Sequence, residues 1–434
     1  MNYSKNKKNE RGQVMILMTL LVLAGSMALA GALLALAQSQ VRTITELSLS
    51  KNAYLLAEGA LEEVVFRHKK GLQVSATETL TVGNSTVVTT TSNYPGGKIV
   101  LSVGEENGRV RKIQSELMEG DGVSFSFGVQ TDNGGIIMRN NSSINGNVFS
   151  NGPIIGHNLN RVNGSAISAG PSGLITEIRA TGTAYAHTIH DSHILGNAHY
   201  TSIDLATVVD GTRFPGAPIL STTSLPISDA LIDSWAEFAS SSAVFEAQCT
   251  AAGGTIVYDE DVTLGPAKIP CNVTFEKHPT VTIAGVLWIV GNLEFKQGPK
   301  FTIHPDIGNR SVPIIVDNPN NRLTSGTVSM RNSGTWTGNG NRSYLLVISR
   351  NESASKGGGV SAITIEQSSG GSLLVYANHG EIELQNNTAL TEITAYRVRL
   401  RNNTKVNYDS GLASAIFTTG PGGSYTIDTW QEVD

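Results

Sequence analysis

The chain has 434 residues, of which 15% are charged and 6% aromatic, and its formal net charge at pH 7 is −5. A nucleic-acid-binding protein ordinarily carries a basic stripe or face, so the net negative charge of this chain does not favour a nucleic acid partner. The 46 glycines and the low charge content are typical of a turn-rich, outward-facing structural protein.

Residues 1–37 have the pattern of a membrane anchor. Residues 1–13 carry four basic side chains against Glu10 alone, and no charged residue occurs from Val14 to Ala37. About 20 apolar residues are enough to cross a bilayer as a helix. Basic residues keep the adjoining end of a span in the cytoplasm. We therefore expect a single-pass protein in contact with membrane lipid, with a cytoplasmic N-terminus and its bulk at the cell surface.

An amphipathic helix is predicted to follow, from Gln38 to Lys70. Its apolar residues recur at steps of three and four, so one stripe can pack on a neighbour. That stripe holds Leu49, Ala53, Leu56, Ala60 and Val64. His68 places positive charge in the last turn and Gly71 can take the left-handed cap, so residues 1–71 form the first predicted domain.

A secretory signal peptide is the competing interpretation of the apolar run. Ala35-Leu36-Ala37 offers a small-residue cleavage site ahead of Gln38. However, the run is longer than a normal signal core, and the helical pattern continues past the site without a break.

Two motifs in this region resemble the N-terminal domain of PilX-type minor pilins. They are Arg11-Gly12-Gln13 at the start of the apolar run and the segment from Ala53 to Glu62 near the end of the helix. In that family an inner-membrane peptidase cuts after the glycine, and the freed helix packs into the core of a pilus or pseudopilus. The resemblance implies processing between Gly12 and Gln13, and pilin-like subunits as partners of the helix. It departs at the fifth position of the expected mature chain. Major pilins carry there a glutamate used for subunit registration, and this chain has Leu17.

Residues 72–118 predict a small antiparallel β-sheet like that of a pilin head. Thr, Val and Ser alternate in short runs, as in residues 98–103 and 109–113, and turn residues separate the runs. Such alternation is typical of a sheet with one buried face.

Residues 119–434 predict a parallel β-helix, or β-solenoid, because a seven-residue motif centred on two asparagines recurs there. Its copies are residues 138–144, 384–390 and 400–406, and the last two begin 16 residues apart. Self-similarity at this period indicates coils that bury their inward faces against one another. Asparagine tolerates left-handed backbone and can stack on an equivalent asparagine one rung away, so we place these pairs at corners. An antiparallel β-sandwich is the rival fold.

A helical insertion is predicted near 226–248, where Ser228 can cap a helix whose apolar face includes Trp235. Cys249 and Cys271, the two cysteines of the chain, follow it. Outside a cell such a pair favours a disulfide, and two buried free thiols are the alternative. Residues 138–155, 226–235 and 423–432 resemble uncharacterised bacterial surface proteins that join a pilin-like start to a β-solenoid; the resemblance implies no activity.

The sequence predicts no cofactor and no catalytic residue, because it holds no phosphate-binding glycine loop, no Gly-x-Ser-x-Gly elbow and no His-Glu-x-x-His motif. His187, His190 and His193 are the weak candidate for a metal site, but residues three apart on a strand point to opposite faces. We therefore interpret these histidines as ordinary polar side chains on the surface of a rung. β-Helices include polysaccharide lyases and hydrolases, which need charged groups converging on one groove; here the acidic residues are scattered, so we expect no enzyme.

The sequence thus predicts a mainly β protein with an N-terminal transmembrane and amphipathic helix, a pilin-like sheet and a β-solenoid with one helical insertion. The function we expect is that of a minor pilin or pilus-associated component in assembly or adhesion, contacting surface glycans or other cell-surface ligands. A static envelope protein that never enters a filament is the first alternative. A carbohydrate-active β-helix enzyme is the second.

Overall fold

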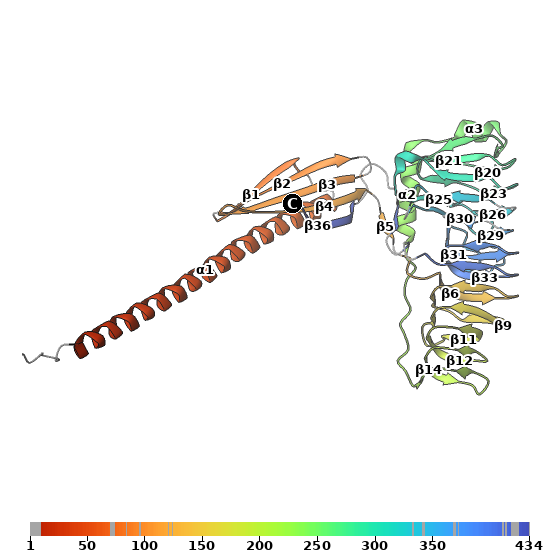
Figure 1. The fold of residues 1–434 in the computed structure, drawn as a ribbon. Coiled ribbons are helices and arrows are strands. Elements are labelled where there is room, and N and C mark those ends of the chain that lie inside the picture. Colours follow the sequence, from red (N-terminus) through yellow and green to blue (C-terminus); the bar gives the residue numbers. More distant parts are fainter. Residues whose placement is uncertain are drawn as a thin grey trace, which may run out of the picture. The chain divides into compact units, whose positions relative to one another are not determined.

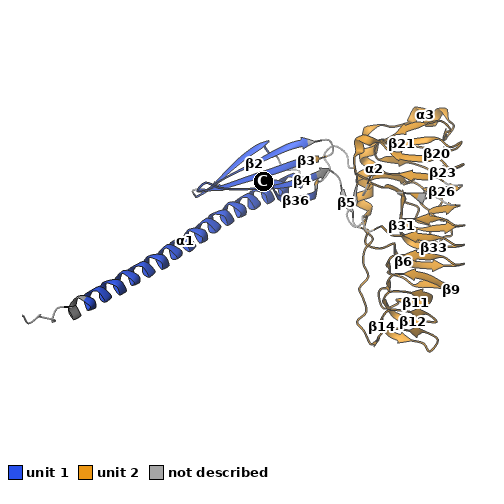
Figure 2. Ribbon diagram, in the orientation of Figure 1, with its two compact units in different colours: residues 1–93, 98–117, 427–434 blue, residues 94–97, 118–426 orange. Residues whose placement is uncertain are grey.

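The computed structural model describes residues 10–69, 74–83, 85–94, 97–119, 121–123, 125–331, 334–340, 343–367, 370–371, 373–409, 412, 415–417 and 425–433. The basic tip before Glu10 and the expected cap at Gly71 lie outside them. The chain forms two compact units, one of residues 1–93, 98–117 and 427–434 and one of residues 94–97 and 118–426 (Figure 2). The mainly β fold with a long N-terminal helix confirms the predicted class.

The first unit combines one long helix with a five-stranded sheet. Its elements are α1 (Glu10–Lys69), β1 (Thr77–Val82), β2 (Ser85–Tyr94), β3 (Gly97–Glu106), β4 (Arg109–Glu119) and β36 (Tyr425–Val433). The strands lie in the order β1-β2-β3-β4-β36, and β1 pairs with β2 in antiparallel register.

The second half of α1 forms the core of this unit with the sheet. Its buried face is built largely from small and branched side chains at the predicted spacing: Ala53, Ala57, Ala60, Leu61, Val64 and Val65. Small residues allow α1 and β3 to pack closely. A Cβ added to Gly104 of β3 would lie 2.2 Å from the carbonyl oxygen of Ala53. The strand therefore needs glycine at this point.

The C-terminal strand corrects one sequence prediction. The sequence predicts a solenoid over residues 119–434, but β36 extends the sheet of the first unit beside β4. Arg111 of β4 and Glu432 of β36 form an ion pair at 2.9 Å. Pairing between strands more than 300 positions apart leaves no local pattern in the sequence, so the periodicity could not reveal it.

The second unit is a parallel β-helix, as predicted. The strands before its helices are β6 (Val129–Met138), β7 (Ser143–Asn145), β8 (Val148–Ser150), β9 (Ile154–Asn163), β10 (Ala166–Ser168), β11 (Leu174–Ala180), β12 (Ala184–His190), β13 (His193–Ile194), β14 (Ala198–Ile203), β15 (Val208–Val209) and β16 (Arg213–Pro215). We call residues 129–215 the early half.

The helices α2 (Asp229–Ser242) and α3 (Glu246–Ala251) come next. They are followed by β17 (Thr255–Tyr258), β18 (Val262–Leu264), β19 (Ala267–Ile269), β20 (Asn272–Phe275), β21 (Thr280–Ile283), β22 (Leu287–Ile289), β23 (Leu293–Phe295), β24 (Lys300–Ile303), η1 (Pro305–Ile307), β25 (Val312–Val316), β26 (Val328–Arg331), β27 (Thr335–Thr337), β28 (Leu345–Ser349), β29 (Ile363–Glu366), β30 (Gly370–Gly371), β31 (Leu373–Gln385), β32 (Ala389–Leu390), β33 (Glu392–Leu400) and β34 (Lys405–Asn407). We call residues 255–407 the late half. β5 (Asp121–Val123) and β35 (Ala415–Phe417) pair as a separate antiparallel ribbon.

The chain enters this solenoid in the middle. β6, the first strand in sequence, pairs on one side with β33, near the end of the late half, and on the other with β8 and β9 (Figure 1). In space the late half therefore runs from β17 to β34, and the early half continues the stack from β6 to β16. After β16 the chain returns along the early half, where Thr223 and Asn151 exchange hydrogen bonds of 2.8 and 3.0 Å. The helix α2 then packs beside β19, β22 and β25.

The repeated asparagine pairs form the corners of consecutive rungs. Asn140, Asn386 and Asn402 have positive φ angles of 53°, 55° and 59°. The amide of Asn402 donates to Asn386 at 3.1 Å, and the amide of Asn140 donates to Asn402 at 2.7 Å. The predicted corner position and amide stack are both confirmed, and the stack crosses the junction between the late and early halves.

Candidate functional site

The first half of α1 is an exposed apolar surface. It lies in the one helix among the described residues that is long and apolar enough to cross a membrane, and its apolar stretch is not buried against the rest of the chain. The hydroxyl groups of Thr19 and Ser26 donate to the backbone carbonyls of Ile16 and Leu23, both at 2.9 Å. The span thus leaves neither of these donors unpaired in lipid, where an unpaired polar group is costly.

The predicted processing residues lie at the start of this helix. Gly12 and Gln13 fall in the first turn of α1, which begins at Glu10. Leu17, one turn later, is 65% exposed. A Cβ added to Gly25 or Gly31 meets nothing within 4 Å, so the small residues of the span are open to neighbours outside this chain.

The two cysteines are joined in the structure. Cys249 of α3 and Cys271, immediately before β20, form a disulfide that closes a separation of 22 residues. Both side chains are buried, at 5% and 7% exposure. The bond ties the short helix α3 to the first rung of the late half.

The three candidate histidines lie on two strands, β12 and β13. His187 and His190 lie on β12, and His190 contacts Asp204 at 3.4 Å. His193 of β13 pairs instead with Asp210 at 3.0 Å. His199 of β14 is stacked between aromatic rings. Over the described ranges no three His, Cys, Asp or Glu side chains converge as a metal would require.

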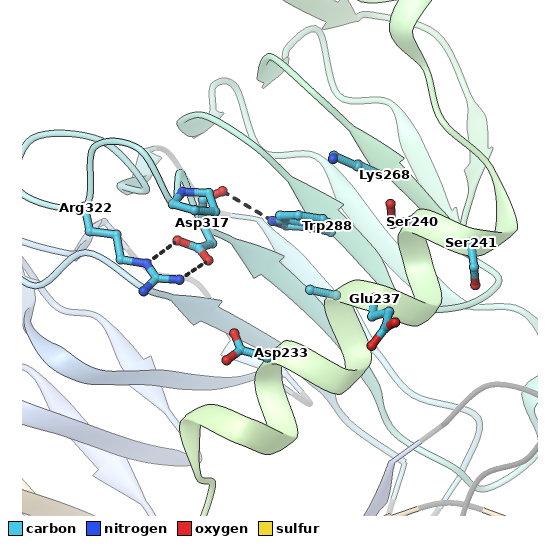
Figure 3. A pocket seen from close by; sticks show the side chains of 10 residues that line it. Asp233, Glu237, Ser240, Ser241, Lys268, Trp288, Asp317 and Arg322 are labelled. Atoms are coloured by element: carbon cyan, nitrogen blue, oxygen red, sulfur yellow. Dashed lines mark hydrogen bonds and ion pairs between the residues drawn. The ribbon is translucent and has the colours of Figure 1, made fainter.

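A groove beside α2 is the concave site that the sequence did not predict. It has a volume of about 600 Å³ and lies between α2, the strands β19 and β22, and the segment that follows β25 (Figure 3). Its lining combines an aromatic ring with charges of both signs: Asp233, Ala236, Glu237, Ser240, Ser241, Lys268, Trp288, Asp317, Pro319 and Arg322. These residues come from helix, strand and loop segments up to 89 positions apart, so no local motif marks the groove.

Most charges of the groove are already engaged. Arg322 donates to both carboxylate oxygens of Asp317 at 2.8 Å, and these bonds raise the pKa of the Arg322 guanidinium. Asp233 accepts a 2.7 Å hydrogen bond from the buried Arg350. Trp288 donates from its ring nitrogen to the backbone of Asp317 at 3.3 Å, while the Lys268 ammonium lies 4.3 Å from the Trp288 ring centroid. Figure 3 shows the bonds that Arg322 and Trp288 make to Asp317 on the strand side of the groove.

A second group of polar contacts fixes α2 itself. Ser228 caps the helix by accepting from the Leu231 N–H, as predicted. Asp229 pairs with His379 at 3.0 Å and contacts Arg350 at 3.4 Å. Burial raises the pKa of Asp229, but the His379 hydrogen bond and the Arg350 charge outweigh it and leave that pKa lowered.

Comparisons with known proteins give little further guidance. No family model matches the chain, and no curated protein matches it. Among solved structures it is similar to the competence-associated pilin ComZ from Thermus thermophilus, at 10% identity and a TM-score of 0.24, over 89% of this chain and 97% of that one. At a TM-score of 0.24 this likeness carries no argument about the fold or the function of the chain.

Proposed function

We propose that this protein is a membrane-anchored, pilin-like surface protein whose β-solenoid serves assembly or adhesion. The observation that carries the proposal is the division of α1. Its first half is exposed and apolar, and its second half forms the core of a small sheet. A helix of this kind holds a head domain on a membrane and leaves an apolar surface for neighbouring helices.

Processing after Gly12 would release such a helix for assembly with pilin-like subunits. The Arg11-Gly12-Gln13 motif at the start of α1 supports this step, and Leu17 is the residue that favours the alternative of a static envelope protein. In the static form the chain keeps residues 1–12 and stays in the membrane, with its solenoid exposed.

We also propose that the solenoid is not an enzyme. Glycoside cleavage typically uses two carboxyl groups flanking the scissile bond. Of the three groove carboxylates, Asp317 is held by Arg322 and Asp233 by Arg350, which leaves only Glu237 outside these pairs. The groove therefore supports binding better than acid–base chemistry.

Recovery from the sheared-surface fraction tests the filament form. In Gly12→Glu a bulky charged side chain replaces the residue after which the peptidase would cut. We expect this variant to remain in membranes while the wild-type chain reaches the sheared fraction. Gly59→Ala is the matched control, because an added Cβ there meets nothing within 4 Å. Equal release of wild type and Gly12→Glu would contradict the filament form and favour the static one.

A further inference from the structure

A column of basic side chains runs along one face of the solenoid across the junction of its halves. Lys405 of β34, Arg161 of β9 and Arg179 of β11 occupy equivalent register positions, with Ser143 of β7 between the first two. We call the three cations the basic strip. Neighbouring strands lie about 4.8 Å apart, so the strip extends roughly 14 Å along the solenoid axis. The rungs that carry it follow one another through β33, β6, β9 and β11 (Figure 1).

The strip faces solvent. The residues that follow its members along the three strands, Val406, Val162 and Ala180, are fully buried in the solenoid core. Successive side chains of a strand point to opposite faces, so the cations point outward. Lys405 and Arg161 are exposed and Arg179 is half-buried.

No member of the strip forms an ion pair within the described part of the chain. Other arginines of the rung that holds Lys405 differ, because Arg399 pairs with Glu381 at 3.1 Å and Arg401 with Glu383 at 2.9 Å. Arg161 and Arg179 lie directly opposite each other on adjacent strands, and like charges in that position destabilise a sheet. Uncompensated cations in a chain of net charge −5 are the arrangement expected where an anionic ligand completes the charge balance.

A column of amides runs parallel to the strip on the same face. Asn407, Asn145 and Asn163 lie two residues beyond Lys405, Ser143 and Arg161. Their side chains are linked by two hydrogen bonds of 2.6 Å. An Asn amide has two donor hydrogens and two acceptor lone pairs, so the exposed amides retain capacity for a ligand.

We propose that this face binds an acidic polysaccharide. Guanidinium groups recognise carboxylate or sulfate bidentately, and the amides suit the hydroxyl groups of the same sugar chain. A single-stranded nucleic acid would call for aromatic side chains on which bases stack, and the register positions of the two columns hold none. The inference deepens the proposed function, on which it rests only for the exposure of the solenoid outside the cell.

Binding of polygalacturonate by the full chain in detergent micelles tests this site. Neutral dextran and an oligothymidylate of similar length serve as comparison polymers. We expect salt-sensitive binding of polygalacturonate and none of dextran. The double variant Arg161→Gln/Arg179→Gln should bind about tenfold more weakly, because it removes two charge-assisted contacts. Lys277→Gln/Lys296→Gln is the matched control: it removes two exposed solenoid cations that are paired with Asp259 and Glu294, and should bind like wild type.

A melting curve of each variant keeps the test interpretable. Removal of the opposed arginines should leave the melting temperature unchanged or raise it, so weaker binding reports the site and not unfolding. Glu177→Gln should strengthen binding, because it removes a negative charge two residues before Arg179. Equal binding of polygalacturonate and dextran, tighter binding of oligothymidylate, or an effect of the control pair as large as that of the arginine pair would overturn the proposal. None of these outcomes bears on membrane anchoring or on cleavage after Gly12, so failure here is distinct from failure of the proposed function.

Discussion

The two halves of the solenoid solve the same packing problem with cores of different width. In the late half, Phe275, Phe295, Phe301 and Trp336 stack inside the coil, and a third sheet of β18, β21, β24, β27 and β30 closes its cross-section. In the early half, equivalent positions on successive strands are Ala166, Ala184 and Ala198, all fully buried. Wide rungs are filled by aromatic rings, whereas narrow rungs need small side chains. The two halves of the same fold therefore require core side chains of different size.

Loss of an aromatic ring from the wide core should have the largest effect. Phe301 is fully buried, with ring centroids of Phe275, Phe295 and Trp336 within 5.3 Å. We expect Phe301→Ala to lower the free energy of unfolding by about 3–5 kcal/mol, because it removes apolar contacts and leaves a cavity. Urea denaturation followed by tryptophan fluorescence measures it. If Phe301→Ala lowered the free energy of unfolding by less than a typical surface substitution does, this aromatic cluster would not stabilise the late half.

Removal of the disulfide should destabilise the capped end of the late half. Cys249→Ala/Cys271→Ala opens a link across 22 positions, and the entropy of a loop of that size corresponds to about 3 kcal/mol. Because the bond joins α3 to the first rung, hydrogen exchange should rise at β17 and β20 and stay unchanged at β12 and β14. Uniform loss of protection through both halves would show that the solenoid unfolds as one unit.

An enlarged side chain should be poorly tolerated in the narrow core. Ala184 is fully buried and lies in register with Ala166 and Ala198. We expect Ala184→Leu to lower the free energy of unfolding by about 1–3 kcal/mol through overpacking. Ile283→Leu in the wide core is the volume-conserving comparison and should cost less than about 1.5 kcal/mol. If the Ala184 variant were as stable as wild type, the early half would not be tightly packed.

The pH dependence of stability should change when the buried carboxyl group at the start of β33 is neutralised. Burial raises the pKa of Glu392 well above its ordinary value of 4.5, although a hydrogen bond from Thr394 partly opposes this. The pKa of Glu392 is higher in the folded than in the unfolded state. Its contribution to folding stability is therefore fully present below the unfolded-state pKa and is lost as the pH rises through the folded-state pKa. Glu392→Gln should therefore resemble wild type in acid and be more stable at alkaline pH. If the melting temperatures of wild type and Glu392→Gln changed with pH in the same way from pH 4 to 9, Glu392 would not be buried in its protonated form.

The sequence predicted the features that depend on local patterns. The apolar run, the buried face at Ala53 and Val64, the Ser228 cap and the asparagine corners all follow from spacing or residue type within short segments. The similarity of residues 138–144 to residues 400–406 indicated a shared rung type. It did not reveal that these copies lie on adjacent rungs, because the pairing joins positions 262 apart. The groove beside α2 and the basic strip also depend on such long-range register.

The identity of the N-terminal residue in the native protein tests the central claim most directly. Mass spectrometry on membrane and sheared-surface fractions measures it. The account predicts a chain that begins at Gln13 in the sheared fraction, with residues 14–37 retained as the apolar helix. An intact N-terminus confined to membranes would leave the static envelope protein, whereas a chain that begins at Gln38 would mean a secreted solenoid and would contradict the anchor.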